Sequence, residues 1–161
     1  MSPATAARDR PRAWVRAVVV VAAVLGSDQL VKALVTSAVD RGAQHDIVAG
    51  IKLVNTRNTG VAFGQLQDGG VIVSVVIAIA IGALLVYFAR HAHVALMWLP
   101  TGMLLGGALG NILDRIREGA VVDFLKLPYW PAFNVADASI TVGVVILLVV
   151  IERGDRARAA G

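Results

Sequence analysis

The sequence predicts an all-α membrane protein with four transmembrane helices. Of its 161 residues, 57% are hydrophobic and only 16% are charged, whereas roughly a quarter of the residues in a soluble domain are charged. The mean hydropathy is +0.73. Four separate segments approach the roughly 20 apolar residues that a helix needs to cross the hydrocarbon core. Together these observations favour a membrane protein over a soluble domain.

The four apolar segments are expected to be helices, because isolated strands would leave backbone groups unpaired in lipid. The first segment is interrupted by Arg16, Asp28 and Lys32, and the fourth contains Asp137 as its single charged residue. The second and third contain no charge. The expected spans are residues 13–35, 71–89, 94–113 and 135–151.

The connections between these spans differ in length. Residues 90–93 make a tight link, whereas residues 36–70 and 114–134 form long connections. The first long connection is rich in turn-forming residues, and its short alternating runs suggest a few strands. Both polar ends of the chain are expected to be mobile tails. The whole chain, residues 1–161, is expected to form a single domain.

Arginine placement predicts how the chain is oriented in the membrane. Arginines gather in the N-terminal tail, in the 90–93 link and in the C-terminal tail, and four spans place all three regions on one side. Both termini are therefore expected in the cytoplasm, with both long connections outside the cell (inner) membrane. The first span lacks a convincing cleavage site, so an uncleaved span is favoured over a signal peptide.

Several chemistries are excluded by composition. The chain has no cysteine, which excludes disulfides, thiolate metal sites and a cysteine nucleophile. Its three histidines form no H-E-x-x-H arrangement. We therefore expect no metal site. We also expect no cofactor and no nucleic-acid partner.

Asp28 and Lys32, in "SDQLVK", lie four residues apart and share one face of the first helix. Near the outer end of the span they can form an ion pair, and Lys32 can extend to the interface. The pair has two compatible interpretations. It lowers the cost of burying two charges, or it braces an active site above it.

The stretch "NTRNTGVAFGQL", residues 55–66, combines turn residues with an apolar tip. One interpretation is a hairpin whose aromatic tip enters the bilayer surface. The other is a loop that faces a substrate, in which the Asn58 amide offers both a donor and an acceptor.

The third span ends in a glycine-rich stretch followed by polar residues. Gly102, Gly106 and Gly110 are spaced by four, a pattern that allows close helix packing. Asp114 and Arg115 then follow near the helix end. They are either interfacial anchors, or the forked donors of Arg115 hold a substrate carbonyl or a carboxylate.

Two acidic residues, Asp123 and Asp137, flank the proline-rich turn that returns the chain to the membrane. Both are expected near the outer boundary, where acidic residues suggest function. Two adjacent carboxyl groups tend to share one proton and can then perform acid–base catalysis on water. Taken singly, Asp123 is also compatible with a loop residue, and Asp137 with a helix N-terminal residue favoured by the dipole.

Four motifs in this order resemble lipoprotein signal peptidase, the signal peptidase II family: "SDQLVK", "NTGVAFG", "GGALGNILDRIREGAVVDF" and "FNVADASI". The resemblance covers residues from about 13 to 151. It implies an intramembrane aspartic endopeptidase with four transmembrane helices. It also implies a small extracytoplasmic β-sheet and a short interfacial helix, for which residues 36–70 are the only stretch long enough.

The same resemblance implies the substrate and the inhibitor. Members of the family cleave the signal peptide from prolipoproteins immediately before a diacylglyceryl-modified cysteine, and they are inhibited by globomycin. The expected partners are therefore prolipoproteins and membrane lipids, and the expected oligomeric state is a monomer.

By this resemblance, Asp123 in "VVDF" and Asp137 in "NVAD" match the catalytic aspartates. Asp28 and Lys32 would support the extracytoplasmic loop. The remaining matched motif positions are Asn58, Gly107, Asn111, Arg115, Asn134 and Ala136. Of these, the resemblance implies that Asn58 and Arg115 hold the substrate backbone. It implies that the two asparagines Asn111 and Asn134 orient the aspartates or the scissile carbonyl.

Two other classes of protein share some of these features. A small proton-coupled transporter also keeps acidic residues in the membrane, usually near the midplane of broken or repeated helices, and the sequence has neither feature. A structural membrane subunit would explain the glycine packing and the charge asymmetry. It would not explain two aspartates flanked by asparagines on one side of the bilayer.

Overall fold

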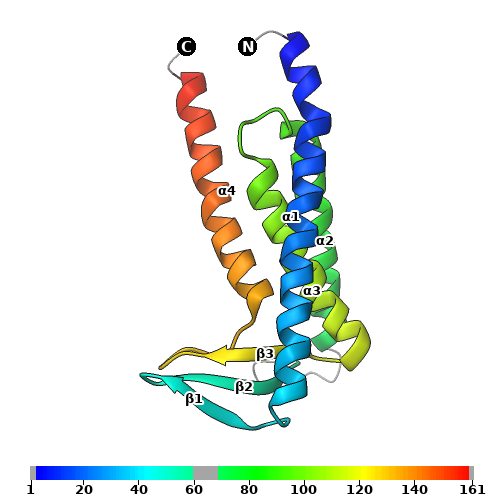
Figure 1. Cartoon of the computed structure of the whole chain (residues 1–161). Helices are drawn as coiled ribbons and strands as arrows, with labels where there is room; N and C mark the ends of the chain where they lie inside the picture. The colour runs from blue at the N-terminus through cyan, green and yellow to red at the C-terminus, as the bar shows by residue number, and fades with distance from the viewer. Residues whose placement is uncertain (1–2, 60–68, 160–161) are drawn as a thin grey trace.

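A computed structural model of the chain describes residues 3–59 and 69–159. Within them, four helices lie side by side and a three-stranded antiparallel sheet crosses one end of the bundle (Figure 1). Both termini lie at the opposite end. In chain order the elements are α1 (Pro3–Ala38), β1 (Gln44–Val48), β2 (Ile51–Asn58), α2 (Gly69–His91), α3 (Trp98–Glu118), β3 (Val121–Lys126) and α4 (Val135–Ala159).

Each expected apolar segment lies within a helix, but α1 and α4 are longer than expected. α1 begins at Pro3 and α4 continues to Ala159, so most residues of the two polar ends are helical. The two ends are therefore regular helix in secondary structure, and their expected mobility stays a prediction. Alanine and arginine, which are abundant in both ends, are strong helix formers, and a proline at the first helical position has no hydrogen bond to lose.

The link between α2 and α3 is longer than the expected residues 90–93. α2 ends at His91, and α3 does not begin until Trp98. Two successive turns fill the interval, with backbone hydrogen bonds from Val94 to His91 and from Met97 to Val94. The apolar character of these residues continues into the helix, so hydropathy alone could not locate its first turn.

The far end of α3 also extends beyond the expected residue 113. The helix continues to Glu118 and ends where Gly119 adopts a φ of +72°. The Gly119 N–H donates to the Arg115 carbonyl oxygen at 3.0 Å. A left-handed glycine that satisfies one of the last carbonyls is a common helix terminator. It also turns the chain directly into β3.

The sheet has the order β1–β2–β3. β1 and β2 form the strands expected within residues 36–70, joined by a two-residue turn in which Ala49 and Gly50 have φ values of +46° and +81°. Positive φ at both central residues matches the turn type that fits the twist of a hairpin. The tip of this hairpin reaches the next connection, because a Cβ on Gly50 would lie 3.1 Å from Pro128 Cγ.

The third strand does not come from residues 36–70, and the expectation that this stretch supplies the whole sheet is wrong. β3 pairs antiparallel with β2, from Lys52 opposite Lys126 to Asn58 opposite Val121. Its first four residues are all buried, so the strand lacks the alternating pattern of a half-exposed strand. The short interfacial helix expected within residues 36–70 stays a prediction, because residues 60–68 lie outside the described residues.

Glycines on α3 bring its neighbours into close contact, as the spacing of four predicted. A Cβ on Gly102 would lie 2.6 Å from the Cβ of Val20, and one on Gly106 would lie 2.8 Å from the Cβ of Val24. α1 therefore rests directly on the α3 backbone. On another face of α3, a Cβ on Gly107 would lie 2.6 Å from the Ala136 carbonyl oxygen of α4.

Replacing Gly107 with alanine is expected to destabilise the protein by about 1–3 kcal/mol, because the added methyl group forces α4 away from α3. The measurement is the thermal unfolding midpoint in detergent. Gly82→Ala on α2 is the matched control, since a Cβ there meets no atom within 4 Å and alanine is the better helix former. Equal midpoints for the two variants would show that the α3–α4 contact tolerates a side chain.

Large apolar side chains point outward from the bundle. Val18 on α1, Ile79 on α2 and Leu148 on α4 are 61%, 67% and 62% exposed. By length and composition, two helical segments among the described residues are able to cross a membrane, Arg10–Ala38 and Val135–Arg156. Such continuous outward-facing apolar surface exceeds what a soluble monomer normally exposes.

Candidate active site

Asp123 and Asp137 come from different elements and meet where the sheet joins the helices. Asp123 is the third residue of β3 and only 2% exposed, whereas Asp137 lies in the first turn of α4. Leu125 and Phe133 exchange backbone hydrogen bonds of 2.9 Å in both directions. This bridge closes the proline-rich turn, so the end of β3 and the start of α4 lie together.

Asn134 connects the two aspartates. It precedes α4 and caps it, because the Asp137 N–H donates to Asn134 Oδ1 at 2.8 Å and the Asn134 N–H donates to Asp137 Oδ2 at 3.3 Å. This reciprocal pair is the asparagine–aspartate form of a capping box. The Asn134 side-chain amide also donates to Asp123 Oδ1 at 2.9 Å. The helix-terminal interpretation of Asp137 is thus confirmed, and the residue that caps the helix also holds the second carboxylate.

Two further asparagines complete the surroundings of the carboxylates. Asn111 Nδ2, on α3, donates to Asp137 Oδ1 at 2.8 Å. Asn58 Nδ2, at the end of β2, donates to Asp123 Oδ2 at 3.0 Å. Each of the four carboxylate oxygens therefore accepts a hydrogen bond from an asparagine. Such fixed donors hold both side chains in one orientation and leave neither free to rotate away.

Burial raises the pKa of the Asp123 carboxyl group. Desolvation raises the pKa of its carboxyl group from 3.8 to about 6, and the negative charge of Asp137 acts in the same direction. Hydrogen bonds from Asn58 and Asn134 and the charge of Lys32 oppose the increase without cancelling it. Asp123 is thus suited to keep a proton under conditions in which an exposed carboxyl group has lost it.

Folding stability is expected to fall as the pH rises from 3.8 to about 6. In that interval the unfolded carboxyl group of Asp123 has released its proton while the folded one retains it, so deprotonation favours the unfolded state. The measurement is the unfolding midpoint in detergent across this range. Asp123→Asn cannot titrate and should flatten the slope, whereas the exposed Asp46→Asn should leave it unchanged. Equal slopes for wild type and Asp123→Asn would contradict the raised pKa.

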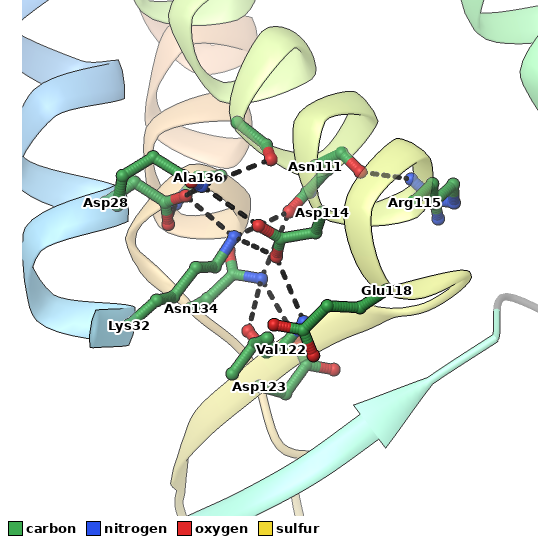
Figure 2. A network of polar contacts seen from close by, with 12 residues as sticks. Asp28, Lys32, Asn111, Asp114, Arg115, Glu118, Val122, Asp123, Asn134 and Ala136 are labelled. Carbon is green, nitrogen blue, oxygen red and sulfur yellow. Dashed lines mark hydrogen bonds and ion pairs between the residues drawn. The ribbon is translucent and has the colours of Figure 1, made fainter. Parts of the chain in front are cut away.

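Behind the aspartates lies a buried ionic cluster, which we call the Lys32 cluster: Asp28 and Lys32 of α1 and Asp114 of α3 (Figure 2). Lys32 Nζ lies 2.7 Å from a carboxylate oxygen of Asp28 and 2.7 Å from one of Asp114. It also donates to Asn111 Oδ1 at 3.3 Å. All three charged side chains are at most 6% exposed. The ammonium group therefore contacts one of the asparagines that hold Asp137.

The Lys32 cluster also fixes the start of α4 and the start of β3. Asp28 Oδ1 accepts from the Ala136 N–H at 2.9 Å, and Asp114 Oδ2 accepts from the Val122 N–H at 3.0 Å. The expected extension of Lys32 to the interface is wrong, because the side chain is only 4% exposed. The bonds of Asp28 and Lys32 run to α3 and α4, whereas the resemblance implied support of the extracytoplasmic loop.

Arg115 lies on α3 one turn beyond Asn111 and donates to the Asn111 carbonyl oxygen at 3.3 Å. Its Nε atom is buried and has no hydrogen-bond partner among the described residues. A buried donor of this kind normally has a partner. The guanidinium group therefore has spare donor capacity one helical turn after Asn111, the asparagine that bonds Asp137.

Sequence reasoning missed two polar residues that hold this site. The sequence suggests an interfacial anchor at Asp114, but this residue is 5% exposed and binds Lys32. Gln29 was not singled out, yet its amide donates to Asp114 Oδ1 at 2.9 Å. No local signal could have found Asp114, because Lys32 already has a counter-charge in Asp28 four residues earlier and the second carboxylate comes from α3.

An apolar groove runs between α2, α3 and α4. It encloses about 280 Å³ and is lined almost entirely by aliphatic side chains. One of them, Ile140, lies one turn after Asp137 on α4. The lining residues are Ile77, Ala80, Ile81, Leu84, Leu104, Ala108 and Ile140.

Comparison with known proteins supports a peptidase. Residues 20–152 match the family model described as signal peptidase (SPase) II. The chain belongs to the signal peptidase II family. It is 37% identical over 131 residues to a lipoprotein signal peptidase of Halothermothrix orenii, a match that covers 81% of this chain and 90% of that relative. It is 43% identical over 129 residues to one of Burkholderia thailandensis, covering 75% of this chain and 78% of that relative.

The fold of this signal peptidase II family member is shared with solved structures of membrane enzymes. One is a bacterial membrane enzyme determined by the in meso method at 1.9 Å resolution, with a TM-score of 0.78 and 28% sequence identity. That match covers 84% of this chain and 91% of the other. A second such structure, at 2.3 Å resolution, gives a TM-score of 0.76. The combination of helices and a small sheet is thus that of a membrane enzyme.

Proposed function

We propose that this chain is an intramembrane aspartic endopeptidase that removes the signal peptide from prolipoproteins immediately before a diacylglyceryl-modified cysteine. The observation that carries the aspartic mechanism is the common neighbour of the two carboxyl groups. Asn134 bonds both Asp123 and Asp137, although the two come from a strand and a helix on opposite sides of a turn. Membership of the signal peptidase II family supports the substrate class.

In the proposed reaction Asp137 acts as the base and Asp123 as the acid. A water molecule attacks the scissile carbonyl carbon, gives one proton to Asp137, and the carbonyl oxygen takes the proton held by Asp123. The C–N bond of the resulting gem-diol then breaks as the leaving nitrogen takes the proton from Asp137, and Asp123 recovers one from a hydroxyl group. The raised pKa of Asp123 and the position of Asp137 at a helix N-terminus support these roles.

The apolar groove and Arg115 supply the means to position a substrate. We assign the apolar groove to the hydrophobic part of the substrate, whose scissile bond would then lie one turn away at Asp137. The unsatisfied Nε of Arg115 would donate to a backbone carbonyl oxygen of the peptide. Asn58 already bonds Asp123 and would share its amide with the substrate. Positioning of this kind provides much of the rate acceleration of an enzyme.

The proposed membrane arrangement has four transmembrane helices in one domain, with both termini in the cytoplasm. The outward-facing apolar side chains of α1, α2 and α4 support it, as does the location of both arginine-rich termini at one end of the bundle (Figure 1). The sheet and the aspartates then lie near the outer face of the cell inner membrane. The protein would act as a monomer, without a metal or cofactor, and would be inhibited by globomycin.

The test is a gel-shift cleavage assay with purified protein in detergent. A diacylglyceryl-modified prolipoprotein and the same polypeptide without lipid are compared as substrates, with and without globomycin. We expect cleavage of the lipidated substrate alone, blocked by globomycin. Equal cleavage of both substrates would show that the enzyme does not recognise the lipid modification. No cleavage by folded protein, together with solute transport in vesicles, would instead support the proton-coupled transporter.

A further inference from the structure

A second pocket lies at the end of the bundle opposite the aspartates. It encloses about 350 Å³ between the N-terminal part of α1 and the link that joins α2 to α3, near both termini (Figure 1). Its lining includes the polar and aromatic side chains of Arg12, Arg16, His93 and Trp98. None of the described residues that line it is acidic. We call this the basic pocket.

The two arginines of the basic pocket are held so that both face it. Arg12 and Arg16 are four residues apart and therefore share one face of α1. The next residues in the chain, Ala13 and Ala17, lie on the neighbouring face of the helix and are buried in the core, so the backbone that carries the arginines is fixed. The Arg16 guanidinium group lies 5.7 Å from the centre of the Trp98 ring, a favourable cation–π distance.

The positive charges of Arg12 and Arg16 are not neutralised by a nearby carboxylate in the part of the chain that the structure describes. Among the described residues, neither Arg12 nor Arg16 forms an ion pair. Two forked donors on one wall of a concave site, without a carboxylate opposite, match the oxygens of a phosphate group. The chemistry recognised at the basic pocket is therefore that of a phosphate anion.

We propose that the basic pocket binds the phosphate group of an anionic phospholipid. A lipid is favoured over free phosphate because apolar surface adjoins the charged wall. Leu96, in the lining, is 50% exposed, and Val15, next to Arg16 on α1, is 63% exposed. Anionic lipids of the cytoplasmic leaflet attract basic residues at this depth. The proposal rests on the membrane arrangement given above, and peptidase activity is not needed for it.

The test titrates delipidated protein in detergent with phosphatidylglycerol and follows the bound lipid by native mass spectrometry. We expect one phosphatidylglycerol to bind more tightly than phosphatidylcholine. Arg12→Gln and Arg16→Gln should each weaken that binding by about fivefold. Arg90→Gln is the matched control, because Arg90 is exposed at the same end of the bundle and does not line the basic pocket. It should bind as wild type does.

Three results would overturn the proposal. Equal binding of the two lipids by wild type would show that headgroup charge is not recognised, and this comparison needs no variant to fold. Equal weakening by Arg90→Gln and the pocket variants would indicate general surface attraction. Displacement of the lipid by an equal concentration of inorganic phosphate would assign the pocket to a free anion. Circular dichroism of each variant checks that helicity is retained.

Discussion

Asp123→Asn and Asp137→Asn should each abolish cleavage of a lipidated prolipoprotein. An amide cannot take a proton from water and cannot act as the acid that protonates the carbonyl oxygen. General acid–base catalysis is worth about 10²- to 10⁴-fold for one group, so turnover should fall at least that far in either variant. The measurement is the initial rate in the gel-shift assay at saturating substrate.

The structure provides a matched control for these two substitutions. Asp46 on β1 has a side chain that is 78% exposed and lies 3.8 Å from Lys52, so Asp46→Asn makes the same change of charge without touching the site. It should retain the wild-type rate. Asparagine keeps one acceptor oxygen at either position and loses the other, so the unfolding midpoint of each variant is measured to show that it is folded. Clear turnover by folded Asp123→Asn or Asp137→Asn would rule out the aspartic mechanism.

Lys32→Met should be the most destabilising single substitution of a charged residue in the described site. It leaves Asp28 and Asp114 buried without a counter-charge, and removing one partner of a buried ionic cluster costs about 3–5 kcal/mol. The same change withdraws the hydrogen bond to Asn111, which holds Asp137. Thermal unfolding in detergent should therefore show a large fall in the midpoint, together with slower cleavage.

Two comparisons separate the buried charge from the length of the side chain. Lys52→Met removes an exposed lysine that is 40% accessible, and its midpoint should stay close to wild type because surface ion pairs contribute about 0–1 kcal/mol. Adding Asp114→Asn to Lys32→Met removes one uncompensated carboxylate and should recover part of the loss. Equal midpoints for Lys32→Met and Lys52→Met would refute a buried ionic role.

The helices could be predicted from apolar runs, but their ends could not. Helix ends depend on local hydrogen bonding, as at Gly119, where one left-handed residue stops α3. β3 was also missed, because a strand that is buried on both faces has no alternating pattern. Its existence depends on pairing with β2, more than 60 residues earlier, and no local signal encodes that partner.

In the candidate site, too, contacts between near neighbours could be predicted from the sequence and contacts between distant residues could not. The spacing of Asn134 and Asp137 is enough to predict a helix cap, because capping is a contact between near neighbours in the chain. The bond between Asn134 and Asp123 needs the return of the chain at Leu125 and Phe133. The contact of Lys32 with Asp114 needs α1 to lie directly on α3, and the glycines of α3 permit that approach.

The sequence by itself determined the apolar segments, the local pair of Asp28 and Lys32, and the presence of two acidic residues beside a turn. These are properties of composition and of contacts within a few residues. Only the tertiary structure decided that asparagines from β2, from α3 and from the turn before α4 surround both carboxylates, and that the pKa of Asp123 is raised. The pKa of a carboxyl group depends on its burial and on charges brought from distant parts of the chain. The increase at Asp123 therefore arises only when β3 and α4 come together.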